Sequence, residues 1–105
     1  MNPGQLRHRI IIQKQITTQD NFGEQYEEWN DITTVWANIN PISGREFFAA
    51  ETVNSEITHK VRLRYREDIK PDMRISYKGR IFRIESVINE FEKNKVLQLM
   101  CKELL

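Results

Sequence analysis

The most regular part of this 105-residue sequence is a stretch of strict alternation at residues 58–66. Apolar and basic side chains alternate along it, with Val61, Leu63 and Tyr65 set between Lys60, Arg62, Arg64 and Arg66. Successive side chains of a β-strand point to opposite faces, so the pattern predicts a strand with one apolar and one cationic face. Such a strand packs against a hydrophobic core on one side only.

Composition favours β structure in the rest of the chain. Isoleucine occurs thirteen times and alanine three times, and β-branched residues suit strands whereas alanine is the strongest helix former. Patterning predicts further strands at residues 6–14, 26–29, 33–40, 73–77, 80–88 and 96–102. The polar stretch 15–24 is predicted to be a turn-rich connection, and residues 41–56 a long irregular segment with room for two helical turns.

Strands at this spacing suit hairpin connections, whereas βαβ units need long crossover helices. Closing the sheet also removes exposed strand edges. We therefore predict an all-β fold, a small barrel of about six mainly antiparallel strands with two long loops and at most one short helix. Because the length suits one modest core, residues 1–105 are expected to form a single β-barrel domain.

Charge and hydropathy exclude several classes of protein. The net charge of +1 argues against a dedicated nucleic-acid binder, which usually carries a strong basic excess. No apolar run reaches the roughly 20 residues that cross a bilayer, so no membrane partner is expected. The first residues lack a signal-peptide pattern, and we expect synthesis in a cytoplasm. A single cysteine, Cys101, excludes an intramolecular disulfide.

Catalytic signals are absent from the sequence. His8 and His59 fall on predicted strands outside any known motif, and the closest acidic pairs read as solvated surface charge. Cys101 lies on the apolar face of its strand and is expected to be a buried, inert thiol. We predict no catalytic residue, no metal site and no cofactor.

Two groups of residues are candidates for binding. The first, a candidate interface, consists of Trp36, which falls on the polar face of its strand, and the cationic row Lys60, Arg62, Arg64 and Arg66. One interpretation is that the row binds phosphate groups or an acidic partner, since arginine binds phosphate and carboxylate bidentately. The other is that it is a solvated face, balanced by acidic residues on a neighbouring strand. Trp36 either belongs to the core, if the sheet is covered there, or marks a protein interface, where exposed tryptophan is typical.

The second group is a candidate assembly or channel loop formed by Gly44, Arg45, Glu46, Phe47 and Phe48. It lies in the segment 41–56, which is long for a loop in a small domain, and such loops are often functional. We expect the two phenylalanines to become buried on assembly, with Gly44 as a hinge. The alternative is that they fold back and cap the open end of the barrel.

An ordered set of short segments resembles the head–tail joining proteins of tailed bacteriophages, also called head-closure or head–tail adaptor proteins. The matching segments are residues 4–10, 20–24, 35–39, 44–46, 59–66, 69–75 and 82–84, together with Trp29, Pro41 and Gly79. The resemblance runs from residue 4 to about residue 103 and rests on the order of the set.

The resemblance implies a non-enzymatic virion protein without a cofactor. Such proteins assemble as a ring, typically dodecameric, beneath the portal, where they help to close the DNA-filled head and connect it to the tail. The implied partners are portal or adaptor proteins, tail proteins, further copies of the chain, and passing DNA through passive contact. A near-neutral charge suits a DNA conduit, because a strongly cationic channel would retain the genome.

Two alternatives remain open at this point. A tail completion or tail-terminator protein would have a similar size and composition. An oligonucleotide-binding β-barrel is suggested by the cationic row, although it would need exposed aromatic side chains on the same face as the arginines. Tyr65 falls on the opposite face by the two-residue period.

Overall fold

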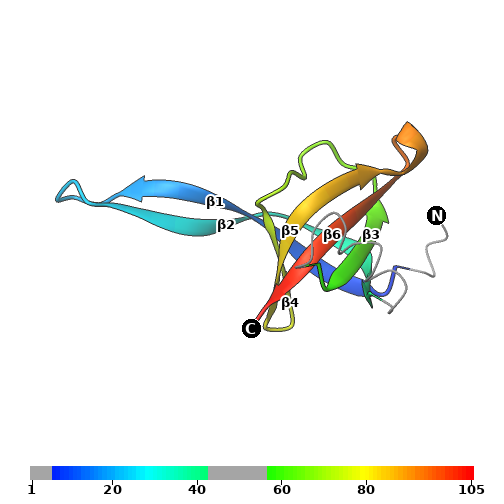
Figure 1. Ribbon diagram of the computed structural model, residues 1–105. Coiled ribbons are helices and arrows are strands. Elements are labelled where there is room, and N and C mark those ends of the chain that lie inside the picture. Colours follow the sequence, from blue (N-terminus) through cyan, green and yellow to red (C-terminus); the bar gives the residue numbers. More distant parts are fainter. Residues whose placement is uncertain (1–5, 43–56) are drawn as a thin grey trace.

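The computed structural model describes residues 6–42 and 57–105 and consists almost entirely of β-strands (Figure 1). The strands are β1 (His8–Gln19), β2 (Gln25–Pro41), β3 (His59–Arg64), β4 (Arg74–Tyr77), β5 (Arg80–Asn89) and β6 (Val96–Leu104). A single turn of 3-10 helix, η2 (Glu90–Glu92), follows β5. The predicted all-β class is confirmed.

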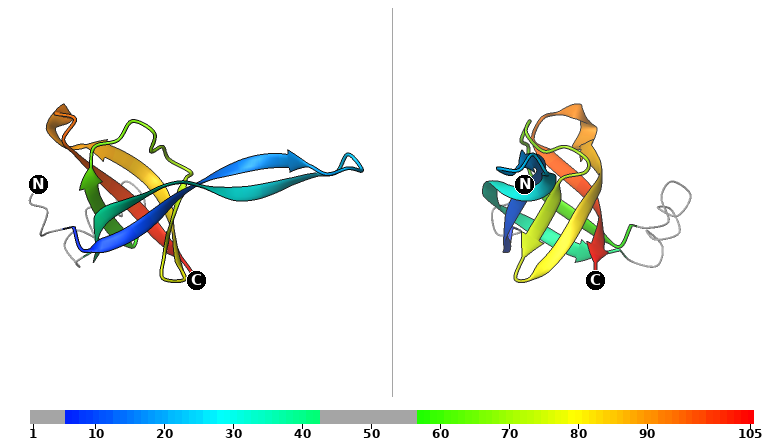
Figure 2. Two further views of the ribbon diagram at one scale, coloured as in Figure 1. Left: turned by 180° about the vertical axis from the view of Figure 1, so that it is seen from behind. Right: turned by 90° about the vertical axis from the view of Figure 1, so that its left-hand side faces the viewer.

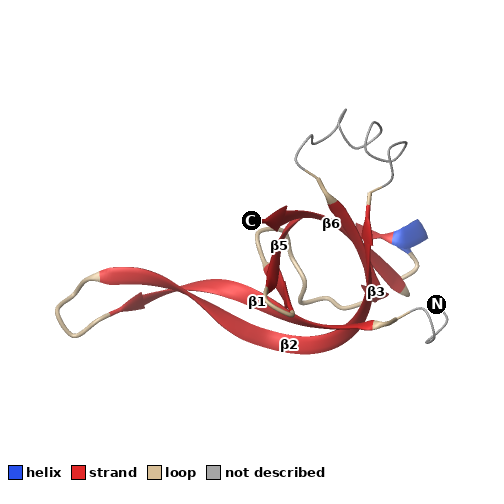
Figure 3. Ribbon diagram, turned by 90° about the horizontal axis from the view of Figure 1, so that it is seen from below, coloured by secondary structure: helices blue, strands red, loops and turns tan. Residues whose placement is uncertain are grey.

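The six strands close into a barrel in the order β1-β2-β3-β6-β5-β4, and every neighbouring pair is antiparallel. Figure 3 shows the strands curving around the barrel interior, with a long two-stranded extension leaving it. Strand β1 completes the barrel by pairing with β4, with Ile12 opposite Ile75. The predicted six-stranded closed barrel is therefore confirmed.

The core fills the barrel from the inward-facing positions of all six strands. Phe82 is the largest fully buried side chain, and the strict alternation of β3 places Val61 and Leu63 beside it in the same core. In β6 the predicted apolar face, Leu97 with Leu99 and Cys101, is also buried. No polar or charged residue among those described is buried, so apolar contact supplies the core.

The prediction of a turn-rich connection at residues 15–24 is wrong. Strand β1 continues to Gln19, and the turn occupies only the residues before β2 begins at Gln25. Asp20 closes this turn, because its Oδ1 accepts hydrogen bonds from the backbone N–H groups of Phe22 (2.8 Å) and Glu24 (2.9 Å). The predicted strands at 26–29 and 33–40 are parts of one strand, β2.

Strands β1 and β2 together extend beyond the barrel as a hairpin arm, which we define as residues 14–32. Pairing of β1 with β4 ends at Gln13, and the β1–β2 register shifts between Ile12 and Gln13. Beyond this point no described strand pairs with the outer edges of the arm. The arm gives the molecule its elongated shape, with extents of 50 × 29 × 27 Å (Figures 1 and 2).

The other connections agree with the sequence in part. Lys78 and Gly79 form the predicted two-residue hairpin turn between β4 and β5, both with positive φ (47° and 80°), which is the backbone that such turns need. Strand β3 ends at Arg64, two residues before the predicted end. The candidate loop residues Gly44–Phe48 lie outside the described residues.

Candidate assembly surfaces

The predicted cationic row is interrupted in the folded chain. The Nη2 atom of Arg62 donates to both carboxylate oxygens of Glu90, at 3.1 and 2.9 Å. Arg66 lies beyond β3 and donates from Nε and Nη2 to Asp68, at 3.0 and 2.9 Å. This contact raises the pKa of Arg66 and lowers that of Asp68 from their ordinary values. Two of the four cations therefore already have carboxylate partners.

The remaining two residues of the row differ from each other. Lys60 is half-buried and interacts with a neighbouring group. Arg64 is exposed at the end of β3, and it forms no ion pair or hydrogen bond with any residue that the structure describes. Arg64 is thus the most exposed member of the row.

Trp36 projects from the outer face of β2, as predicted, and 49% of its surface is exposed. The Arg9 guanidinium lies 5.2 Å from the centroid of its ring. A cation at this distance is attracted by the π-electrons of the indole. Arg9 and Trp36 are opposite each other in the β1–β2 register, so the ladder itself holds this pair together.

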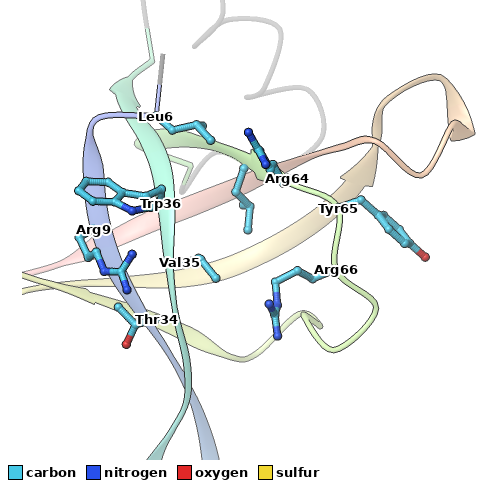
Figure 4. Close-up of a pocket in the computed structure, with 9 residues that line it drawn as sticks. Leu6, Arg9, Thr34, Val35, Trp36, Arg64, Tyr65 and Arg66 are labelled. Carbon is cyan, nitrogen blue, oxygen red and sulfur yellow. The ribbon is translucent and has the colours of Figure 1, made fainter. Parts of the chain in front are cut away.

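A groove opens beside Trp36, where β2 and β3 separate. The two strands pair from Pro41 and His59 as far as Ala37 and Leu63, and then diverge. The resulting groove has a volume of about 520 Å³, and the described residues that line it include three arginines and no acidic residue (Figure 4). We call it the arginine groove; its lining residues are Leu6, Arg9, Thr34, Val35, Trp36, Leu63, Arg64, Tyr65 and Arg66.

The hairpin arm is a second exposed surface, and the sequence did not indicate it. It contains one lysine and five acidic residues, a net charge of −4: Lys14, Asp20, Glu24, Glu27, Glu28 and Asp31. None of these carboxylates forms an ion pair within the described part of the chain. Their hydrogen-bond partners are neutral, as in the contact from Gln13 to Asp31 (2.8 Å).

Large apolar side chains accompany the acids of the arm. Phe22, in the turn at the tip, is 93% exposed, and Tyr26 is 45% exposed. The two strands of the arm form a single layer, so neither face is covered by a core. Exposed aromatic groups of this kind are common at protein–protein contacts.

The two histidines have separate hydrogen-bond partners, and His59 is opposite Cys101 in the β3–β6 register. His8 Nδ1 accepts a hydrogen bond from the Ile39 N–H (3.2 Å), whereas His59 contacts the Thr58 hydroxyl (2.9 Å). Burial lowers the pKa of His59, and burial raises the pKa of the Cys101 thiol. Within residues 6–42 and 57–105, no group of three or more His, Cys, Asp or Glu residues could hold a metal ion. No helix in these ranges is long and apolar enough to cross a membrane.

Comparison with known proteins finds a matching phage protein family and relatives within it. The family described as phage head completion protein matches residues 1–104. Head completion protein gp7 of Enterobacteria phage HK97 is 28% identical over 107 residues, covering 97% of this chain and 96% of the relative. Head completion protein gp16 of Bacillus phage SPP1 is 28% identical over 72 residues, covering 69% of this chain and 66% of that protein.

Two solved structures share the fold. Protein SF1141 from Shigella flexneri 2a, solved in solution, is 32% identical with a TM-score of 0.78, covering 98% of this chain and 96% of its own. A chain in the virion of a native gene transfer agent particle has a TM-score of 0.67 at 20% identity, with 94% and 96% covered, and shows likeness of fold alone. Since the family match spans nearly every residue, this chain belongs to the phage head completion protein family.

Proposed function

We propose that this chain is a structural protein of a phage or prophage virion, in which it helps to close the DNA-filled head and joins it to the tail. The observation that carries the proposal is the family match over residues 1–104, together with a phage head completion protein that aligns over 97% of the chain. A rigid closed barrel with two exposed surfaces suits a part that must contact several neighbours at once.

In this role the chain would form a ring beneath the portal, of which a dodecamer is the proposed form. Portal or adaptor proteins would bind on one side of the ring and tail proteins on the other, while DNA passes through with passive contact only. The chain would act as a connector without catalysis or a cofactor. Trp36 and Arg64 are the proposed contact residues, because both are exposed at the arginine groove.

The candidate loop Gly44–Phe48 is retained as a proposed channel or assembly segment on its sequence alone. The oligonucleotide-binding alternative has less support, because Glu90 and Asp68 neutralise two of the four cations on which it depended. Tail completion is the alternative most similar to the proposed role. An experiment that examines heads and tails separately distinguishes the two.

Deleting the gene from the phage or prophage that encodes the chain tests the proposal. We expect DNA-filled heads and complete tails to accumulate separately, and purified wild-type protein to restore joining when it is added to the mutant heads. A tail completion protein would give the opposite result, in which mutant heads join wild-type tails and mutant tails fail. Normal yields of infectious particles after deletion would exclude both roles.

A further inference from the structure

We propose that the hairpin arm of one copy docks on the arginine groove of the next copy, and that this contact builds the ring. The inference rests on the proposed function, because it specifies how copies associate within the connector. The occupant of the groove is then a second copy of this chain, and the arm is the segment of that copy that binds.

Charge complementarity is the first argument. The arm carries a net charge of −4, and its carboxylates have only neutral partners in the described part of the chain. Among the described residues, none that lines the groove is acidic, and Arg9 and Arg64 have no carboxylate partner. Guanidinium and carboxylate groups match in geometry as well as in charge. Opposite potentials on two surfaces of one chain favour contact between copies and orient it.

Apolar surface is the second argument. Phe22 and Tyr26 are exposed on the arm, and the groove presents Leu6, Trp36 and Tyr65 beside its arginines. Aromatic residues and arginine are the types most enriched where protein interfaces bury their central contacts. A groove of about 520 Å³ has room for a large side chain from the tip of the arm. Docking would also cover the outer edges of β1 and β2 in the arm, with which no described strand pairs.

The third argument is that the arm cannot reach the groove of its own chain. Ile11, which is opposite the groove residue Thr34, lies eight residue positions before Gln19, the last residue of β1. At the rise of an extended strand this distance is about 26 Å. Arg74 fixes the root of the arm, since its guanidinium lies 4.2 Å from the Trp29 ring centroid and donates to Gln13 (2.6 Å). The arm therefore points away from its own barrel (Figure 1).

The symmetry of such a contact agrees with a ring. The arm and the groove are different patches, so each copy binds its neighbour head to tail. Contacts of this type close into rings when the rotation between neighbours allows it, whereas a two-fold dimer uses the same patch twice. Arm-to-groove docking thus predicts a closed ring rather than a pairwise dimer.

Site-specific photo-cross-linking in assembled particles tests the contact. Phe22 is replaced by the photoreactive residue p-benzoylphenylalanine, and particles are made from a mixture of 15N-labelled and unlabelled chains. We expect cross-linked peptides that join residue 22 of one isotopic form to residues 34–36 or 63–66 of the other. Cross-links from residue 22 mainly to a portal protein, a tail protein or DNA would overturn the docking while leaving the proposed function intact.

Charge-reversal variants provide a second, independent test of the contact. The arm variant is Glu27→Lys with Glu28→Lys, and the groove variant is Arg9→Glu with Arg64→Glu. Each is expected to lower the yield of joined particles about tenfold or more, because like charges then face each other, and combining all four changes in one chain should restore most of it. Lys78→Glu with Glu92→Lys, at exposed positions outside both surfaces, is the matched control and should behave as wild type.

The outcomes separate the two proposals. A combined variant that joins no better than the single variants, with folding verified by circular dichroism, would contradict the docking. If a variant fails to fold, the cross-linking result decides. If the wild-type chain is absent from the particles, the proposed function is wrong, and so is the docking that rests on it.

Discussion

The Arg74 guanidinium lies over the Trp29 indole ring, 4.2 Å from its centroid, and joins the barrel to the root of the hairpin arm. Arg74 comes from β4 and Trp29 from β2, two strands that are not neighbours in the sheet. The same guanidinium donates from Nε to Gln13 (2.6 Å). One residue of the barrel thus contacts Trp29 in the arm and Gln13, the residue just before the arm, and so sets the direction of the arm.

Replacing Trp29 with alanine should loosen the arm without unfolding the barrel. Loss of the cation–π contact removes about 1 kcal/mol of local stabilisation, so amide hydrogen exchange should quicken in residues 14–19 and 25–31. Exchange in β5 and β6 should stay as in the wild type. Tyr26→Ala, an arm substitution at an exposed position, is the matched control and should have little effect on exchange at the root. Equal exchange in both variants would show that Trp29 does not anchor the arm.

The barrel core predicts a large loss of stability from a single truncation. Phe82 is fully buried, and Phe82→Ala should lower the free energy of unfolding by about 3–5 kcal/mol, through lost transfer free energy and the cavity that remains. Phe91, which is 86% exposed, provides the control, and Phe91→Ala should change stability by less than about 0.5 kcal/mol. Urea unfolding measures both. A small loss for Phe82→Ala would mean that the barrel collapses around the gap.

Stability should fall as the solution is acidified from pH 7.5 to 5.5. Burial lowers the pKa of His59 below its ordinary value of 6.5, with Arg80 acting in the same direction and Glu103 opposing it. The unfolded chain then binds a proton at a higher pH than the folded one, so His59 contributes stability above pH 6.5 that is lost as the pH decreases. His59→Gln should make the urea midpoint less dependent on pH in this range. An unchanged pH dependence in that variant would exclude His59 as its source.

The isolated protein should bind single-stranded DNA only weakly. Arg9 and Arg64 are the groove arginines without a carboxylate partner in the described part of the chain. Two phosphate contacts on a single strand predict a slope of about −1.4 for the logarithm of the affinity against that of the salt concentration. Fluorescence anisotropy across a salt series measures it, with Lys78→Gln as the control for Arg64→Gln. Tight binding at physiological salt that is lost in Arg64→Gln would instead favour the oligonucleotide-binding function.

The barrel was predictable because its strands carry a one-sided pattern. Val61 and Leu63 alternate with basic residues because one face of β3 packs against the core, and the Lys78–Gly79 turn has a local signature that does not depend on tertiary structure. The arm was missed because it lacks this one-sided pattern. Thr17 and Gln19 belong to a hairpin that packs against a core on neither face. The two-residue period that marks a half-buried strand is therefore absent there.

The candidate site was less predictable, because it depends on contacts between distant segments. The partner of Arg62 is Glu90, placed by the turn after β5, and no local pattern connects the two residues. The groove likewise forms only where β2 and β3 diverge, which brings Trp36 and Arg64 to its two sides. The sequence correctly placed Trp36 on an outer face, but it gave no indication of the cavity beside it.

Imaging of the head–tail junction by cryo-electron microscopy tests the central claim most directly. The particles are those made by the phage or prophage that encodes the chain. We predict a ring of copies beneath the portal, in which each copy shows the closed barrel of β1–β6 with its arm lying on a neighbour. A junction whose density is fully explained by other proteins, with this chain absent or located elsewhere in the particle, would contradict the account.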